Sequence, residues 1–135
     1  MGSRKRESAL KRKEQKKEAV MVKLNKCPVS PRKMRLVADQ IRGLDVKKAL
    51  NVLKFSSKAA SVKVEKLLLS AIDSWQLKNQ DSDVEKFNFK IKEIRVDSGT
   101  MLKRIRFASR ARVHRIRKRT NHVTLVLDVQ PIEIS

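Results

Sequence analysis

The chain has 135 residues, enough for one compact domain, and its 34 Lys and Arg against 14 Asp and Glu give a net charge of +20. Such an excess repels itself unless a polyanion binds, and nucleic acid is the obvious partner. A membrane-bound protein would need an apolar span, an apolar surface or a lipid anchor, and the sequence shows no 18-residue apolar run and no lipidation motif. We therefore expect no membrane partner.

Cysteine and histidine are too scarce for structural cross-links. Cys27 is the single cysteine and His114 and His122 are the two histidines, so neither a disulfide framework nor a zinc site can be built within the chain. No apolar segment follows the basic residues 4–6, as a secretory signal would require. We expect a protein of the reducing cytoplasm that holds no metal and no cofactor.

The charge is unevenly placed. Residues 1–35 hold thirteen Lys and Arg against three acids and residues 86–122 hold thirteen against two, whereas residues 36–85 hold eight against seven. This partition predicts a globular body whose middle, residues 36–85, is nearly neutral, with two cationic extensions. Residues 19–135 are expected to form a single α+β domain that includes the long hairpin. Residues 1–18 form the first extension, and with Ala9 and Leu10 as its apolar anchors it is expected to be disordered or marginally helical when free. Ordering on RNA and a solvated tail remain equal alternatives for it.

Three helices are predicted after a short strand. Val20, Val22 and Leu24 alternate with other residues, which predicts a strand over residues 19–26. Ser30 is a suitable N-cap and Pro31 a suitable first residue for a helix that ends at Gly43. A second helix follows near residues 46–53, and the longest runs over about residues 57–78.

The apolar face of the longest helix includes the only tryptophan. The face consists of Ala60, Val64, Leu67, Leu68, Ala71, Ile72 and Trp75. Because Trp75 continues this helical stripe, it is better interpreted as a core anchor than as a platform for base stacking. Asp81, Asp83 and Glu85 then lie in a polar turn, which we prefer to a metal site because the glycine and terminal acid of a calcium loop are missing.

The period changes to two after the polar turn, which predicts a pair of strands. Phe87, Phe89 and Ile91 share one face, but the phase then slips, so we expect a β-bulge near Lys92 and Glu93. A matching strand is predicted over residues 120–129. The predicted fold is therefore α+β, with three helices packed on a small antiparallel sheet and a long extended β-hairpin over about residues 96–123.

The segment between these strands carries the strongest signal. Residues 103–119 hold nine Lys and Arg, seven of them arginines, and no acid occurs from residue 98 to residue 127. Its few large apolar side chains cannot offset an ordering entropy of roughly 1–2 kcal/mol per residue, so a partner must contribute. Two extended legs of about twelve residues would project about 40 Å beyond the sheet. The planar guanidinium groups of the arginines can bind phosphates and stack on bases, which favours RNA as the partner. The alternative is a flexible basic loop that binds any polyanion weakly.

Residues 30–43, SPRKMRLVADQIRG, closely resemble the SPRK-R-LVAD-IRG signature of the bacterial large-subunit ribosomal protein twenty-two family. Shorter matches follow in the family's order: residues 49–53 with Phe55, residues 58–60, residues 66–67 and 70–72, Val96-Asp97, and several basic positions of the hairpin. The resemblance covers about residues 28–128.

The resemblance implies a structural protein of the large ribosomal subunit, not an enzyme. It would bind large-subunit ribosomal RNA, contact neighbouring large-subunit proteins, support subunit assembly and place its hairpin tip where it helps line the nascent-peptide exit tunnel. No small-molecule substrate is implied. From this resemblance and the charge pattern we expect RNA contacts from Arg32, Lys33, Arg35, Lys58, Lys103, Arg104, Arg106, Arg110, Arg112, Arg115, Arg117, Lys118, Arg119 and His122.

The hairpin tip departs from the family pattern. The family usually reads Pro-Arg-Ala-x-Gly-Arg-Ala where this chain reads FASRARV over residues 107–113, so Ala111 stands at the place of the glycine. The loss of proline and glycine removes a fixed φ and a permissive backbone position, and we expect a turn of different shape. Arg110 would compensate for the arginine missing at Ala108.

Two other functions fit parts of the sequence. A general architectural protein could place the same basic arm in a DNA minor groove, and equal binding to duplex DNA and structured RNA would favour it. An RNA-processing enzyme would need a general base, but His114 and His122 lie in the basic hairpin without a carboxylate cluster or a Gly-rich phosphate loop nearby. His122 is interpreted as RNA-facing or structural, and His114 as solvated.

Overall fold

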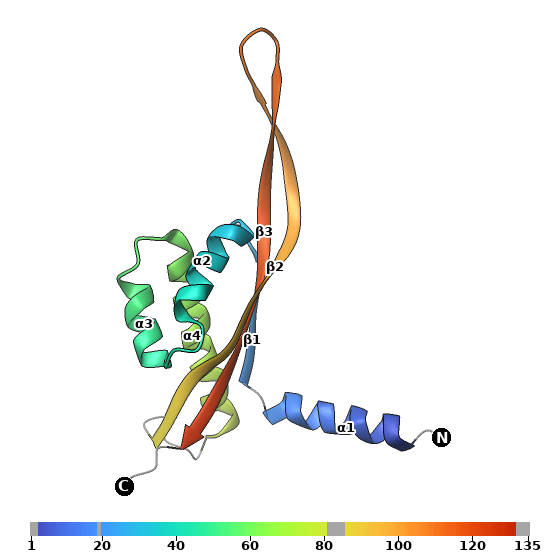
Figure 1. The fold of residues 1–135 in the computed structure, drawn as a ribbon, viewed down its shortest axis with the longest axis vertical. Coiled ribbons are helices and arrows are strands. Elements are labelled where there is room, and N and C mark those ends of the chain that lie inside the picture. Colours follow the sequence, from blue (N-terminus) through green and yellow to red (C-terminus); the bar gives the residue numbers. More distant parts are fainter. Residues whose placement is uncertain (1–2, 19, 81–85, 132–135) are drawn as a thin grey trace.

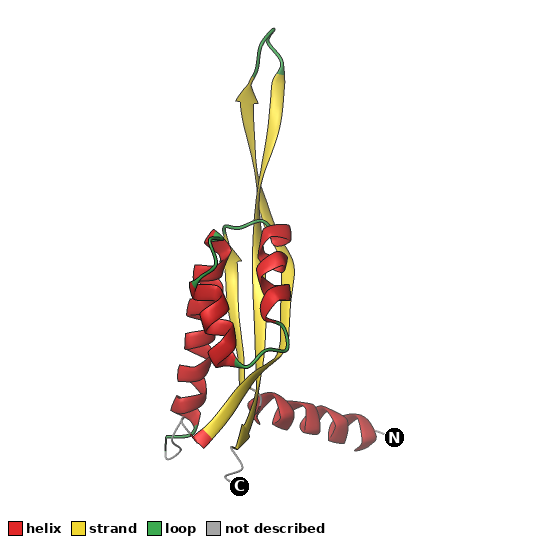
Figure 2. Cartoon of the chain, turned by 60° about the vertical axis from the view of Figure 1, so that its left-hand side comes forward, coloured by secondary structure: helices red, strands yellow, loops and turns green. Residues whose placement is uncertain are grey.

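The computed structural model describes residues 3–18, 20–80 and 86–131, which form four helices and three strands (Figure 1). The elements in chain order are α1 (Ser3–Glu18), β1 (Val20–Cys27), α2 (Pro31–Ile41), α3 (Val46–Lys54), α4 (Ala59–Lys78), β2 (Phe87–Phe107) and β3 (Val113–Pro131). The strands form one antiparallel sheet in the order β1-β3-β2. Helices α2, α3 and α4 cover one face of this sheet, and β2 and β3 continue beyond them as a narrow arm (Figure 2). The predicted fold class is confirmed.

The boundaries of α2 follow from its sequence. Ser30 is the N-cap, its Oγ accepts a hydrogen bond from the Lys33 N–H at 3.5 Å, and Pro31 occupies the first turn without the loss of a needed donor. Past the C-cap, Gly43 adopts a φ of +77°, the left-handed conformation that ends a helix at little cost for glycine. The predicted start and end of this helix are therefore confirmed.

One hydrophobic core lies between the helices and the sheet. Its largest fully buried apolar side chains come from every layer: Met34, Ile41, Leu53, Leu68, Ile91, Ile94 and Leu125. Trp75 is 7% exposed, and its ring centroid lies 4.9 Å from that of Phe87 and 5.0 Å from that of Phe89. The T-shaped and tilted arrangements are those that aromatic rings prefer. Trp75 is a core anchor, as its helical spacing predicted.

Two register shifts bend the β2–β3 ladder. Ile91 pairs with Leu127 while Glu93 pairs with Val126, so one extra residue, Lys92, is accommodated in β2, as the phase slip predicted. A second shift, which was not predicted from the sequence, lies between Ser98 and Met101, at the root of the arm. Before the first bulge the odd-numbered residues of β2 face the core, and after it the even-numbered residues do, so Ile94 and Val96 are buried.

Arginine side chains fix α2 to the sheet. The Arg35 guanidinium donates from Nε at 3.3 Å and from Nη2 at 3.0 Å to the carbonyl oxygen of Val96. Arg42 donates to the Ile94 carbonyl oxygen at 3.1 Å and to Asp39 Oδ1 at 2.7 Å. Hydrogen bonds from a charged donor are stronger than neutral ones. These contacts hold α2 against β2 just before the arm begins.

The structure adds a fourth helix to the three that were predicted. Residues 3–18, expected to be disordered or marginally helical, form α1, which extends away from the body (Figure 1). Its strong helix formers explain the conformation, and residues 4–13 are all exposed, in agreement with the scarcity of apolar anchors. Its behaviour when free, and the division of the chain at residue 18, stay predictions. Asp81, Asp83 and Glu85 lie outside the described residues.

Candidate nucleic-acid interface

The predicted basic segment is a two-stranded arm. Strand pairs run without a break from Met101–Arg119 to Phe107–Val113, and the ten steps from Asp97 to Phe107 span about 33 Å at roughly 3.3 Å each. This length is close to the expected 40 Å. All residues from 101 to 119 are exposed except Ala108, which is half-buried. The arm therefore has no core of its own and stands free of the body (Figure 2).

Cations cover both faces of the arm. Paired residues share a face and neighbours alternate, so Lys103, Arg115, Arg117 and Arg119 lie on one face and Arg104, Arg106 and Lys118 on the other. Most of these cations sit opposite an apolar residue, as in the pairs Ile105–Arg115 and Arg104–Ile116. Within the described chain none of them takes part in an ion pair. The arm can thus meet anions on either side at once.

The tip is a tight turn without glycine. The Ala108 N–H donates to the Arg112 carbonyl oxygen at 2.9 Å, and the Arg112 N–H donates to the Ser109 carbonyl oxygen at 3.4 Å. Arg110 and Ala111 have φ values of 58° and 54°, and two consecutive positive φ values are what a type I′ turn requires. For residues with a Cβ this conformation costs roughly 1–2 kcal/mol each. The arm therefore ends in a strained turn that carries Arg110 and Arg112.

The remaining predicted cations lie on the body, and one of them has an unexpected role. Arg32, Lys33 and Lys58 are exposed, at the first turn of α2 and at the N-cap of α4. Arg35 instead donates two hydrogen bonds to Val96, so the structure gives it a bracing role that its place in the signature did not reveal. Its RNA contact, like those of the other predicted residues, stays a prediction.

The two histidines differ in their surroundings. His122 is half-buried, pairs with Asp97, and its Nδ1 accepts a hydrogen bond from the Lys26 N–H at 3.0 Å. This bond links β3 to the end of β1, where Lys26 has a φ of 52°. The sequence left open whether His122 faces RNA or has a structural role, and this hydrogen bond gives it a structural role. His114 is exposed on the arm, opposite Arg106.

A group of cations on the sheet face that the helices leave open was not predicted from the sequence. Thr124 of the central strand pairs with Lys23 on one side and with Arg95 on the other, so the three residues form one row across the sheet. Arg95 also contacts Glu93, with Nε 3.0 Å from Oε1. The alternation of β1 and β2 was the signal that could have located Lys23 and Arg95 on this open face.

The described residues contain neither a cluster of metal-ligating side chains nor a helix that could cross a membrane. In residues 3–18, 20–80 and 86–131 there is no group of three metal-ligating side chains. None of the described helices combines the length and the hydropathy that a membrane crossing requires.

Fold and charge together define a class of protein: a small α+β body that holds a long arm with cations on both faces. The sequence model of the family "Ribosomal protein L22p/L17e" matches residues 22–128, and the chain belongs to this family. A protein of Christiangramia forsetii named "Large ribosomal subunit protein uL22" is 61% identical over 127 residues, which cover 94% of each chain. The proteins of that name from Flavobacterium johnsoniae and Bacteroides fragilis are 61% and 56% identical and are covered to 93% of their lengths.

Family membership decides several of the predictions. The predicted ribosomal family of bacterial type is confirmed, and with it a structural, non-enzymatic role in the ribosome, a particle of the bacterial cytoplasm. The architectural-protein and enzyme alternatives are therefore set aside.

Proposed function

We propose that this protein binds large-subunit ribosomal RNA through the arm and the exposed cations of α2 and α4, and that it supports assembly of the large subunit. The observation that carries the proposal is the arm itself, which has nine Lys and Arg between residues 103 and 119, no acid and no core. A free arm of this charge repels itself, and phosphates on both sides would relieve that repulsion. The named relatives, large-subunit ribosomal proteins, support the choice of RNA.

Binding to folded RNA explains why the arm is a paired ladder. A flexible basic loop would have to lose its conformational entropy on binding, roughly 1–2 kcal/mol per residue. The β2–β3 hydrogen bonds fix much of this conformation in advance, so less of the binding free energy is spent on ordering. The two bulges and the α2 contacts direct the arm away from the body, which sits at the surface of the bound RNA in this proposal.

The tip is proposed to line the nascent-peptide exit tunnel. Phe107 and Val113, the last pair before the turn, are 84% and 48% exposed, and Arg110 and Arg112 follow them. Such a mixed apolar and cationic tip suits a passage lined by RNA through which peptides of every composition move. A photo-crosslinking residue in place of Arg110 should label a stalled nascent chain, whereas one in place of Lys47 on α3 should not. Labelling from both positions, or from neither, would contradict the tunnel assignment.

Co-sedimentation tests the ribosomal proposal. Tagged protein is followed through separated ribosomal particles after a high-salt wash, which removes loosely held cationic proteins. We expect near-stoichiometric recovery in the large subunit. Recovery only in free or DNA-bound fractions would contradict ribosomal RNA binding and would make the architectural role the better account.

A further inference from the structure

The two edges of the sheet differ. At the β2 edge, the loop between α2 and α3 covers part of the strand: the Ile91 N–H donates to the Leu44 carbonyl oxygen at 3.0 Å, and Asp45 forms an isolated bridge with Lys90. At the other edge, β1 pairs with β3 on one side, and no described strand pairs with its outer side. An open strand edge is a template for a further strand.

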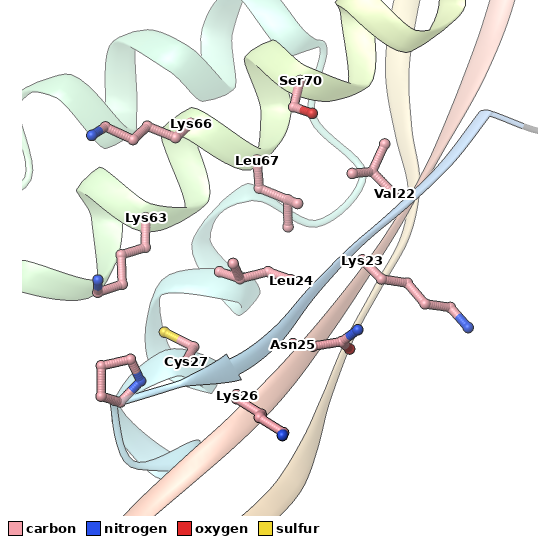
Figure 3. A pocket seen from close by; sticks show the side chains of 11 residues that line it. Val22, Lys23, Leu24, Asn25, Lys26, Cys27, Lys63, Lys66, Leu67 and Ser70 are labelled. Carbon is pink, nitrogen blue, oxygen red and sulfur yellow. The ribbon is translucent and has the colours of Figure 1, made fainter.

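A groove runs between this open edge and α4. Its volume is about 390 Å³, and the side chains of Leu24 and Leu67 point toward one another across it (Figure 3). Leu67 is 5% exposed, while Val22 and Leu24 are half-buried against the core. The floor of the groove is thus apolar, and alternate residues of one strand supply it.

Lysines come from both elements that line the groove. Lys63 and Lys66 belong to α4, whereas the side chains of Lys23 and Lys26 leave β1 on the side away from α4, where Lys23 shares the open face of the sheet with Thr124 (Figure 3). No acidic residue occurs among the described residues that line the groove. The groove therefore favours an anionic occupant and disfavours a second copy of this +20 chain.

We propose that this groove binds an extended acidic peptide segment of a neighbouring protein, which adds to the outer edge of β1 as a fourth strand. Alternate aliphatic side chains of the peptide contact Leu24 and Leu67, and the carboxylates between them point to the opposite face of the sheet, where they meet the lysines of β1. Main-chain hydrogen bonds supply affinity and the alternating pockets supply specificity, as in other cases of strand addition. An RNA segment would use the lysines alone and would leave the apolar floor and the strand edge without partners.

A designed peptide tests the proposal on the full-length protein. The probe is a fluorescein-labelled octapeptide of alternating valine and glutamate, and the control has the same composition in two blocks, all the valines followed by all the glutamates. At about 150 mM salt, where screening beyond about 8 Å weakens unspecific attraction, we expect the alternating peptide to bind at least threefold more tightly. Its amide shift changes should be confined to residues 20–27 and 63–70. Equal binding of both peptides would overturn the proposal, because charge alone would then explain it.

Two variants separate the groove from the overall charge. Lys23→Ala with Lys26→Ala removes the two exposed cations of β1 that would meet the carboxylates, and Lys47→Ala with Lys54→Ala removes two exposed cations of α3 outside the groove. We expect the first pair to weaken the alternating peptide about three- to tenfold and the second less than about twofold. Equal losses would contradict a site in the groove.

Strand addition and RNA binding are distinguished by two competitors. A peptide of the alternating sequence with methylated amides cannot donate main-chain hydrogen bonds, and we expect it to bind at least threefold more weakly. A single-stranded RNA octamer should displace the peptide poorly. If the methylated peptide binds equally well, or if the RNA displaces the peptide at a lower concentration and shifts the same amides, the groove is an RNA site and the proposal is wrong.

Discussion

Removal of four arm cations should change the salt dependence of RNA binding more than any other property. The variant replaces Lys103, Arg104, Arg115 and Arg119 by Ala. Each phosphate contact contributes about 0.7–0.9 to the slope of log K against log salt, so four lost contacts should flatten that slope by about 3. When the salt concentration rises from about 50 to 200 mM, the variant should therefore lose about 60-fold less affinity than the unmodified protein loses.

The structure indicates that this variant still folds. The four side chains are exposed, none of them is in an ion pair of the described chain, and Lys103 lies opposite another cation, Arg117. Their loss should therefore leave the circular dichroism spectrum and the melting temperature unchanged or slightly improved, since like charges in opposite positions destabilise a sheet.

Fluorescence anisotropy with a large-subunit ribosomal RNA transcript, repeated over a series of salt concentrations, gives the slope. The matched control replaces the exposed Lys47, Lys48 and Lys54 of α3, which are not predicted to touch RNA, and its slope should change by less than about 0.5. An unchanged slope for the arm variant would refute the reasoning, as would an equal change per charge in the α3 control.

Three further predictions concern the framework of the arm. Ala111→Gly should stabilise the tip by about 0.5–1 kcal/mol, because it relieves the positive φ of 54°, and hydrogen exchange of the arm amides should slow; faster exchange would contradict this. Gly99→Ala would place a Cβ 2.5 Å from the Thr120 Oγ1 and should destabilise the protein by about 1–3 kcal/mol in urea unfolding. Thr120→Ala in the same chain should recover part of that loss, and an unchanged urea midpoint for the single variant would show that the bulge adapts. Arg35→Ala should cost about 1–2 kcal/mol in the same assay and Arg32→Ala less than about 0.5, so equal costs would argue against the bracing contact.

The sequence predicted those elements in which burial imposes a pattern. Trp75 continues a helical stripe because that face meets the core, and the phase slip near Lys92 was visible because Ile91 and Ile94 both have to reach the core. The second bulge, near Gly99, left no such signal. Residues 97–101 of β2 contribute no buried apolar side chain, so no hydrophobic alternation marks the register there.

The sequence alone revealed which basic residues form the candidate interface, but not all the contacts that these residues make within the fold. The nine cations of residues 103–119 stand out in the sequence, and the structure shows them exposed on the arm. The two hydrogen bonds from Arg35 to Val96 join residues that are far apart in the chain, and a signature motif does not distinguish an arginine that faces solvent from one that braces a sheet. The row of Lys23, Thr124 and Arg95 likewise depends on the register between strands.

The order of the strands has a consequence for how this protein is made. The central strand, β3, is the last described element of the chain, so neither β1 nor β2 has a partner strand until residues 113–131 have been synthesised. Val20 pairs with Leu127, which lies more than 100 residues later in the chain, and pairing over such separations is intrinsically slow. A chain interrupted before residue 113 would have helices but no sheet and no arm, and its exposed apolar surfaces would favour aggregation. Formation of the sheet and formation of the arm therefore both depend on the last described strand of the chain.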